Sequence, residues 1–192
     1  MNLAEFFKTE FAEHREVTQR TEAGLQTAFA GLVTACVTSI RAGGKLMLFG
    51  NGGSAADAQH LATELTIRYK KNRAAIAAIA LTTDSSALTA AGNDLGFDQI
   101  FARQIEALGK PGDVAIGIST SGTSPNVIAA LKQAKAGGLI TAALGGKNGG
   151  DLAQCADHLL VVPSDTTARI QEMHILLGQM LCGALEIELG LA

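Results

Sequence analysis

The sequence has no tryptophan, one tyrosine and three prolines among its 192 residues, and only 4% of its residues are aromatic. It also lacks an extended cluster of lysine and arginine, since its one basic run, RYKKNR at residues 68–73, is short, and its formal net charge is −3. Proteins that bind nucleic acid or an anionic membrane through a basic surface need such a cluster, so neither partner is expected. Any anion that binds is therefore small and held locally.

Cysteine is scarce as well. The three cysteines, Cys36, Cys155 and Cys182, are widely spaced among apolar or small residues. This spacing fits neither a disulfide framework nor a zinc finger, so we expect buried, reduced thiols. No run of about 18 apolar residues is evident, and the N-terminal stretch mixes both charges without the pattern of a signal peptide. These features predict a cytoplasmic protein.

Hydrophobic residues make up 47% of the chain, and 22 residues are glycine. This composition favours Ala, Val, Ile and Leu packing with many tight turns, which is typical of α/β proteins. The length and the absence of repeats or Pro-rich linkers predict one domain over residues 1–192. Residues 1–42 are expected to form an N-terminal helical extension, as two segments that meet near Gly24, with an apolar face for packing on the domain or on another subunit.

Short apolar runs alternate with amphipathic stretches along the rest of the chain. This alternation predicts a three-layer α/β/α sandwich around a mainly parallel five-stranded sheet. The expected strands are 45–50, 75–81, 113–119, 139–144 and 158–163. The expected helices are 54–70, 85–107 in two pieces, 124–136, 150–156 and a long final helix from 169.

Two loops follow strands at the edge where open parallel sheets bind ligands. The loop STSGTSPN, after the third strand, carries five hydroxyl side chains in six positions: Ser119, Thr120, Ser121, Thr123 and Ser124. Such a loop can hold a phosphate without lysine or arginine, with help from the next helix N-terminus. Alternatively, it is only a turn in which Thr123 or Ser124 caps the helix. Because the sequence lacks a Walker A or dinucleotide motif here, a sugar monophosphate is favoured over a nucleotide.

The loop GNGGS, after the first strand, leaves backbone accessible at Gly52 and Gly53, and Asn51 offers both a donor and an acceptor. Ser54 is expected to cap the next helix. An ordinary tight turn would use the same residue types, so this loop alone is weak evidence for a ligand site.

The helix that this loop opens carries His60, Glu64 and Arg68 at positions i, i+4 and i+8, which share one face. One interpretation is a Glu64–Arg68 surface ion pair beside a solvated His60. The other is an imidazole and a carboxylate that share a proton-transfer task or hold a divalent metal.

Taken together, five stretches resemble the phosphoheptose isomerases, which have the sugar isomerase (SIS) fold, and the resemblance runs over almost the whole chain. The stretches are GNGGSAADAQHLATEL, LTTDSSALTAAGNDLGF, GDVAIGISTSGTSPNVIAAL, GGDLAQCADHLLVVPS and ARIQEMHILLGQMLC. The resemblance implies an aldose–ketose isomerase that converts sedoheptulose 7-phosphate to D-glycero-D-manno-heptose 7-phosphate through an enediol, for the heptoses of lipopolysaccharide or related heptosides. It also implies a homotetramer.

The resemblance carries residue roles onto this chain. Glu64 matches the catalytic carboxylate. One Zn²⁺ per subunit is implied, with ligands at His60, Glu64, Gln171 and Gln179. The implied substrate-binding residues are Asn51, Gly52, Gly53, Ser54, Glu64, Arg68, Asn93, Asp94, Ser119, Thr120, Ser121, Ser124 and Gln171.

Gln179 departs from the family pattern, because these isomerases usually carry a histidine eight residues after the Gln of RIQE. A glutamine cannot exchange a proton near neutral pH, although its carbonyl oxygen can coordinate a metal. Either Gln179 is a natural variant with an impaired or altered mechanism, or it is a deliberate replacement. His174 is a possible substitute, or it is simply a histidine packed in a helix interface.

Gln171 and Gln179 are eight residues apart, about 12 Å along one helix, which is too far for both to hold one ion from a straight helix. We therefore expect a site shared between subunits. Two other functions stay open: a non-enzymatic SIS-fold adaptor that binds the bacterial replication initiator, and an isomerase of another sugar phosphate.

Overall fold

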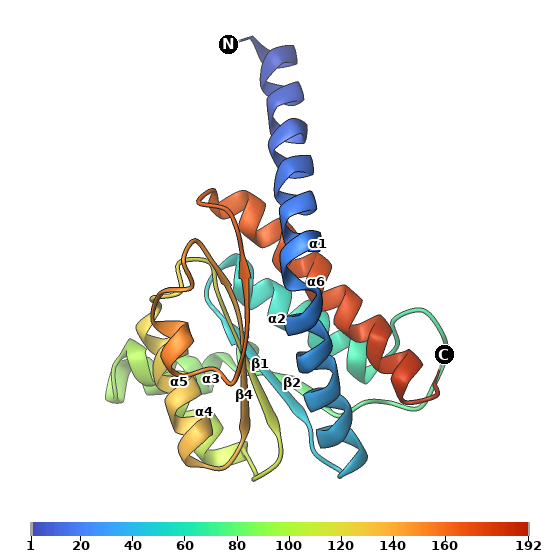
Figure 1. The fold of residues 1–192 in the computed structure, drawn as a ribbon. Helices are drawn as coiled ribbons and strands as arrows, with labels where there is room; N and C mark the ends of the chain where they lie inside the picture. The colour runs from blue at the N-terminus through green and yellow to red at the C-terminus, as the bar shows by residue number, and fades with distance from the viewer. Residues whose placement is uncertain (1, 192) are drawn as a thin grey trace.

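The protein forms a five-stranded sheet with helices on both faces (Figure 1). The structure, a computed structural model, describes residues 2–191, so Met1 and Ala192, the ends of the expected 1–192 domain, lie outside it. The strand order is β2-β1-β3-β4-β5, and every neighbouring pair is parallel. The strands are β1 (Leu46–Gly50), β2 (Ala78–Ala80), β3 (Val114–Ser119), β4 (Ile140–Gly146) and β5 (His158–Val162). The predicted α/β fold is confirmed.

Two hydrophobic clusters hold the three layers together, one on each face of the sheet. Along β1, Leu46 and Leu48 point into one cluster, and Met47 and Phe49 point into the other, as the two-residue period of a strand requires. The first cluster is covered by α1 (Leu3–Arg41), α2 (Gly53–Thr66) and α6 (Thr167–Glu188). The second is covered by α3 (Ser85–Asp94), α4 (Ala102–Leu108) and α5 (Pro125–Ala136).

The order of the strands reverses direction between β1 and β3. From β1 the chain passes to β2 on one side, whereas from β3 it passes to β4 and then β5 on the other. Gly50 and Ile118 are register partners near the carboxyl ends of these two central strands. The loops that follow β1 and β3 therefore flank the crevice where sheets of this kind bind ligands.

The expectation of two N-terminal helices was wrong, because α1 runs unbroken through Gly24. A single glycine costs a helix only about 1 kcal/mol, and the long helix-forming stretches on both sides outweigh it. Asn2 caps the start by accepting a hydrogen bond from Glu5 N at 2.9 Å. The first turns project beyond the rest of the domain (Figure 1) and expose large apolar side chains, namely Leu3, Phe6, Phe7 and Phe11.

By length and composition, α1 could cross a membrane, which the sequence reading had not expected: an 18-residue window has a mean hydropathy of 1.4. In the structure, the apolar side chains of its C-terminal half instead join the core. Polar side chains also tie α1 to α6, through a contact of His14 with Glu172 (2.8 Å) and an ion pair of Arg169 with Glu10 (3.2 Å).

Three other boundaries differ from expectation. The helix expected over 54–70 ends at Thr66, where the chain turns toward the edge strand. The segment expected as a helix over 150–156 is a 3-10 turn, Gly150–Gln154, which opens on glycines with positive φ. The edge strand β2 is shorter than the expected 75–81, because it pairs only with β1. The segment 85–107 is two helices as predicted, separated by a 3-10 turn, Phe97–Gln99.

The opposite edge of the sheet, remote from the loops after β1 and β3, is held by Asp113. Its buried carboxylate pairs with Lys45 Nζ and accepts hydrogen bonds from Lys45 N and Lys110 N, both at 2.9 Å. Burial raises the pKa of Asp113, but these bonds and the lysine charge outweigh it and hold the pKa below the ordinary value of 3.8.

An Asp113→Asn variant should therefore lose about 1–3 kcal/mol in the free energy of unfolding at pH 7, measured by urea titration. Because the folded pKa is depressed, this stabilisation is complete above pH 3.8 and disappears as the pH falls further. The difference between the wild type and the variant should shrink in acid. A difference that stays constant or grows below pH 3.8 would contradict this assignment.

Candidate active site

The loop between β3 and α5 gathers hydroxyl groups at the carboxyl edge of the sheet. Ser119 is buried, and its Oγ lies 2.9 Å from Ser124 Oγ and 3.4 Å from Ser121 Oγ. The turn depends on Gly122, which has φ +72°; a Cβ there would lie 2.4 Å from Gly149 O. Neighbouring Thr120 is half-buried. The loop therefore presents a compact group of hydroxyls at the start of a helix.

The structure does not support the alternative in which Thr123 or Ser124 only caps α5. Ser124 occupies the capping position, but its hydroxyl bonds to Ser119, and no side chain within residues 2–191 makes the capping hydrogen bond. Thr123 directs its N–H and hydroxyl at Ser121 Oγ instead. A helix N-terminus without a side-chain cap keeps its affinity for an anion, which favours the phosphate interpretation.

The loop after β1 exposes mainly backbone, because most of its residues are glycine. Gly52 takes the capping position of α2 with φ +55° and ψ −119°, a conformation that favours glycine. The prediction that Ser54 caps this helix was wrong: α2 begins at Gly53, so Ser54 lies inside the first turn and is buried. A Cβ on Gly53 would meet Gln171 Nε2 at 2.6 Å, so the loop touches the start of α6.

Asn126 joins the two loops, a role that the sequence reading missed. Asn51 Nδ2 donates to Asn126 Oδ1 at 2.9 Å, and Asn126 Nδ2 donates back to Asn51 Oδ1 at 2.8 Å. Asn126 is only 1% exposed. Asn51 keeps one further N–H and one lone pair for a ligand. The only sequence signal was the position of this asparagine in the first turn of the helix after STSGTSP.

On α2, His60 and Glu64 form a pair, with Nε2 and Oε1 3.1 Å apart. Gln179 Nε2 on α6 lies 3.3 Å from the same His60 nitrogen, so three polar side chains from two helices meet at one point. Arg68 does not share this face, because α2 ends before it; among residues 2–191 the acidic partner of His60 is Glu64, and a Glu64–Arg68 pair is not formed.

The other predicted site residues lie at the GNGGS loop and at the end of α3. Gln171 stands beside Gly53, two turns of α6 before Gln179. Asn93 and Asp94 are exposed at the end of α3, where Asn93 Nδ2 donates to Asp94 Oδ1 at 2.7 Å. A cavity of about 490 Å³ separates the α3 end from the GNGGS loop and is lined in part by Asn51, Gly52 and Gly92.

Two further ionisable residues, His174 and Asp57, have shifted pKa values. His174 is buried, and its Nε2 donates to Gly145 O at 2.9 Å; burial lowers its pKa to about 4, so it is a packed, neutral histidine rather than a substitute at the Gln179 position. Asp57, which the sequence reading missed, lies one turn before His60. Burial raises the pKa of Asp57, and the nearby His60 partly opposes the shift. Its i, i+3 spacing from His60 was the available signal.

Comparisons with known proteins agree with this arrangement. The SIS domain family matches residues 11–146. The phosphoheptose isomerase of Paramagnetospirillum magneticum is 59% identical over 186 residues, which cover 97% of each chain. Solved structures of phosphoheptose isomerases from Neisseria gonorrhoeae and Francisella tularensis superpose with TM-scores of 0.91 and 0.93 at 45% and 37% identity; each covers 96% of this chain, and 99% and 98% of their own.

The chain belongs to the phosphoheptose isomerase family. It is therefore a sugar-phosphate isomerase. The sugar isomerase domain of a transcription factor from Sphaerobacter thermophilus, at 23% identity and a TM-score of 0.67, shares the fold alone. The three cysteines are free and buried, as expected from the sequence.

The Asn51–Asn126 pair predicts strong coupling between the two loops. Asn51→Ala or Asn126→Ala should each lower the free energy of unfolding by about 1–3 kcal/mol, because each leaves a partner amide without its hydrogen bonds. The double variant should lose clearly less than the sum, with a coupling energy of about 1 kcal/mol or more in a urea double-mutant cycle. Strictly additive losses would show that the pair does not join the loops.

Proposed function

We propose that this protein interconverts sedoheptulose 7-phosphate and D-glycero-D-manno-heptose 7-phosphate, for the synthesis of heptoses destined for lipopolysaccharide or related heptosides. The observation that carries the proposal is the His60–Glu64 pair, which lies on the helix that begins at the GNGGS loop, beside the hydroxyl loop. The names of the relatives supply the substrate class.

The hydroxyls of residues 119–124 and the N-terminus of α5 would bind the phosphate, because together they offer many donors without a competing side-chain cap. The backbone of Gly52 and Gly53 and the remaining capacity of Asn51 would contact the sugar hydroxyls. Ser54, which is buried, would support this loop, while Asn93 and Asp94 would contact the outer part of the sugar. Arg68 lies beyond the far end of α2 and would contact a sugar only in the site of a neighbouring subunit.

Glu64 would carry the proton. Starting from the ketose, its carboxylate removes a proton from C1, and the electron pair forms the C1–C2 double bond of an enediol as O2 gains a proton. Return of the proton to C2, with loss of the O1 proton, gives the aldose, so the overall change is an isomerisation. Proton exchange at O1 and O2 needs a second group.

Gln179 can donate a hydrogen bond to one of these oxygens but cannot exchange a proton. His60 lies 3.1 Å from Glu64 and 3.3 Å from Gln179 and can exchange one. We therefore assign the exchange at oxygen to His60 when no metal is bound to it. The rate should be lower than with a dedicated acid/base group at position 179, which would contribute about 10²–10⁴-fold.

We propose Zn²⁺ as the cofactor, one per subunit. His60 Nε2 and Glu64 Oε1 supply an imidazole and a carboxylate at one point, which suits a divalent metal, and the Gln179 amide lies beside them. Within the described residues there is no group of three or more His, Cys, Asp and Glu that could hold a metal, so this donor set fits a weakly bound ion. When bound, the metal would stabilise negative charge on the substrate oxygens.

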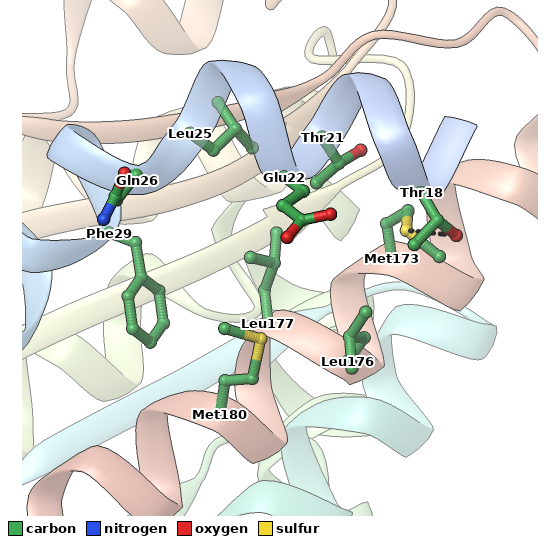
Figure 2. A pocket seen from close by; sticks show the side chains of 10 residues that line it. All are labelled: Thr18, Thr21, Glu22, Leu25, Gln26, Phe29, Met173, Leu176, Leu177 and Met180. Carbon is green, nitrogen blue, oxygen red and sulfur yellow. Dashed lines mark hydrogen bonds between the residues drawn. The ribbon is translucent and has the colours of Figure 1, made fainter. Parts of the chain in front are cut away.

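The partner we propose is the same chain, as a homotetramer with active sites between subunits. A groove of about 400 Å³ between α1 and α6 has an apolar floor of Leu25, Phe29 and Leu177, and α6 exposes Leu176 and Met180 along its rim (Figure 2). The projecting turns of α1 carry further exposed phenylalanines. An apolar helical surface of this extent is typical of a subunit interface.

Two other functions make different predictions. A non-enzymatic adaptor for the replication initiator has no need of the His60–Glu64 pair, which disfavours it. An isomerase of another sugar phosphate would use the same hydroxyl loop, because that loop recognises the phosphate. We place the protein in the cytoplasm, since ion pairs such as Arg169–Glu10 tie α1 to α6 and keep α1 with the domain.

Turnover of sedoheptulose 7-phosphate, followed with and without added zinc, tests the function. Glu64→Gln should abolish it, because an amide cannot accept the proton. Gln179→His should raise kcat by about tenfold or more, because it adds an acid/base group beside Glu64. Added zinc should increase the rate in both the wild type and this histidine variant.

A Gln104→His variant is the control, because this half-buried glutamine lies on α4, and its amide bonds to Leu81 O and Ile100 O. It should not raise kcat. Turnover of another sugar phosphate alone would support the second alternative. If neither the wild type nor Gln179→His isomerises any sugar phosphate, the enzyme assignment fails.

The proposed interface is tested by Met180→Glu. A carboxylate on the apolar rim of the groove should shift the sedimenting species from tetramer to smaller forms, because burying a charge is costly and Glu22, which also lines the groove, would repel it. Leu108→Glu is the matched control: Leu108 is 44% exposed and Met180 46%, but Leu108 lies on α4 across the sheet. A wild-type monomer, or equal dissociation by both variants, would overturn the assembly.

A further inference from the structure

Arg73 is a buried charge in an otherwise exposed loop. The segment between α2 and β2 is largely exposed, yet the side chain of Arg73 is only 2% exposed. Its Nε donates to Glu186 Oε1 at 2.9 Å, and the Glu186 side chain is 3% exposed. Burying two charges costs much of what their attraction returns, so an ion pair like this is weak evidence of a purely stabilising role.

The rest of the guanidinium holds the end of α2. Arg73 Nη2 donates to Glu64 O at 2.8 Å, and Nη1 donates to Leu65 O at 2.7 Å and to Ala74 O at 3.0 Å. The last carbonyls of a helix lack partners within the helix and carry its partial negative charge. The last turn of α2 has no basic residue of its own, so Arg73, reaching back from the loop, supplies the positive charge.

The same guanidinium fixes α2 against α6. Glu186 lies on α6, seven residues or two turns after Gln179, and its Oε1 also accepts Tyr69 N at 3.2 Å. Polar contacts therefore connect the two helices at two levels. At the site, His60 contacts Gln179, and two turns further along α6, Arg73 links the end of α2 to Glu186. Glu64 lies between these two contacts, and its own backbone oxygen belongs to the second.

We infer that Arg73, with Glu186, is a positioning residue that sets the place of the Glu64 carboxylate against α6. The inference rests on the proposed role of Glu64 as the base. The planar fork of arginine bonds two successive carbonyls and a carboxylate at once, which lysine cannot do. Loss of this fork lets the last turn of α2 loosen and moves Glu64 relative to the substrate carbon.

Arg73→Lys tests this link, because it keeps the charge and removes the fork. We expect kcat to fall at least tenfold while KM changes less than twofold, since displacement of a catalytic group by about 1 Å can cost about 10²-fold in rate, whereas the phosphate loop is untouched. Hydrogen exchange of peptides within residues 61–69 should accelerate at least tenfold. An unchanged kcat, or a change confined to KM, would overturn the inference.

The matched control is Asp113→Asn, which breaks another ion pair, between a buried carboxylate and a partly exposed lysine, at the opposite edge of the sheet. It should lower the melting temperature but leave kcat and the exchange of residues 61–69 unchanged. An equal fall of kcat in both variants would show that Arg73 acts only through general stability.

If Arg73→Lys does not fold, Glu186→Gln carries the test. It leaves the guanidinium on the carbonyls but removes its charged anchor on α6, so kcat should fall at least threefold, and exchange at 61–69 should rise; no change in either overturns the inference. If the wild type does not isomerise sedoheptulose 7-phosphate, the proposed function fails, and hydrogen exchange alone still decides whether Arg73 fixes the end of α2.

Discussion

The reversal of strand order between β1 and β3 is the constraint on which the site depends. Because both strands are parallel and adjacent, their loops emerge side by side at one edge. The two hydrogen bonds between the side-chain amides of Asn51 and Asn126 then fix the distance between these loops. A loop of hydroxyls and a loop of bare backbone become one surface only because the chain turns in opposite directions from these two strands.

Close packing of α2 on α6 brings together His60, Glu64 and Gln179, to which we assign the proposed chemistry. A Cβ on Gly178 would lie 2.4 Å from the Leu61 side chain, and a Cβ on Gly53 would meet Gln171. Small residues at these points let the helix backbones approach, so His60 comes within 3.3 Å of Gln179. Both helices begin at the ligand edge of the sheet, and residues that are far apart in sequence therefore meet in register along them.

The sequence was sufficient to predict the features that follow from hydrophobic periodicity and amino-acid composition. The runs that form β1 and β3 are apolar throughout, so their burial between two layers of helices was predictable, as was the position of the loops after them. The i, i+4 spacing likewise predicted that His60 and Glu64 share a face. Features that depend on a single contact were not predictable. The end of α2 at Thr66 is held by hydrogen bonds from Arg73, seven residues further along the chain. The pairing of Asn51 with Asn126 spans 75 positions.

The positions of Gln171 and Gln179 show that these two glutamines do not belong to one group of ligands within a single chain. Eight residues place Gln171 and Gln179 about 12 Å apart along α6, and the structure puts the former at the GNGGS loop and the latter at His60. One chain can therefore offer His60, Glu64 and Gln179 to a common ion, and the spacing constrains only Gln171. A metal-binding histidine is also uncharged, so a glutamine differs from it by offering a carbonyl oxygen in place of a ring nitrogen and by being unable to exchange a proton. Under the proposed mechanism, the residue at 179 would therefore affect metal binding and acid/base chemistry at the same point, through the one nitrogen of His60 that it contacts.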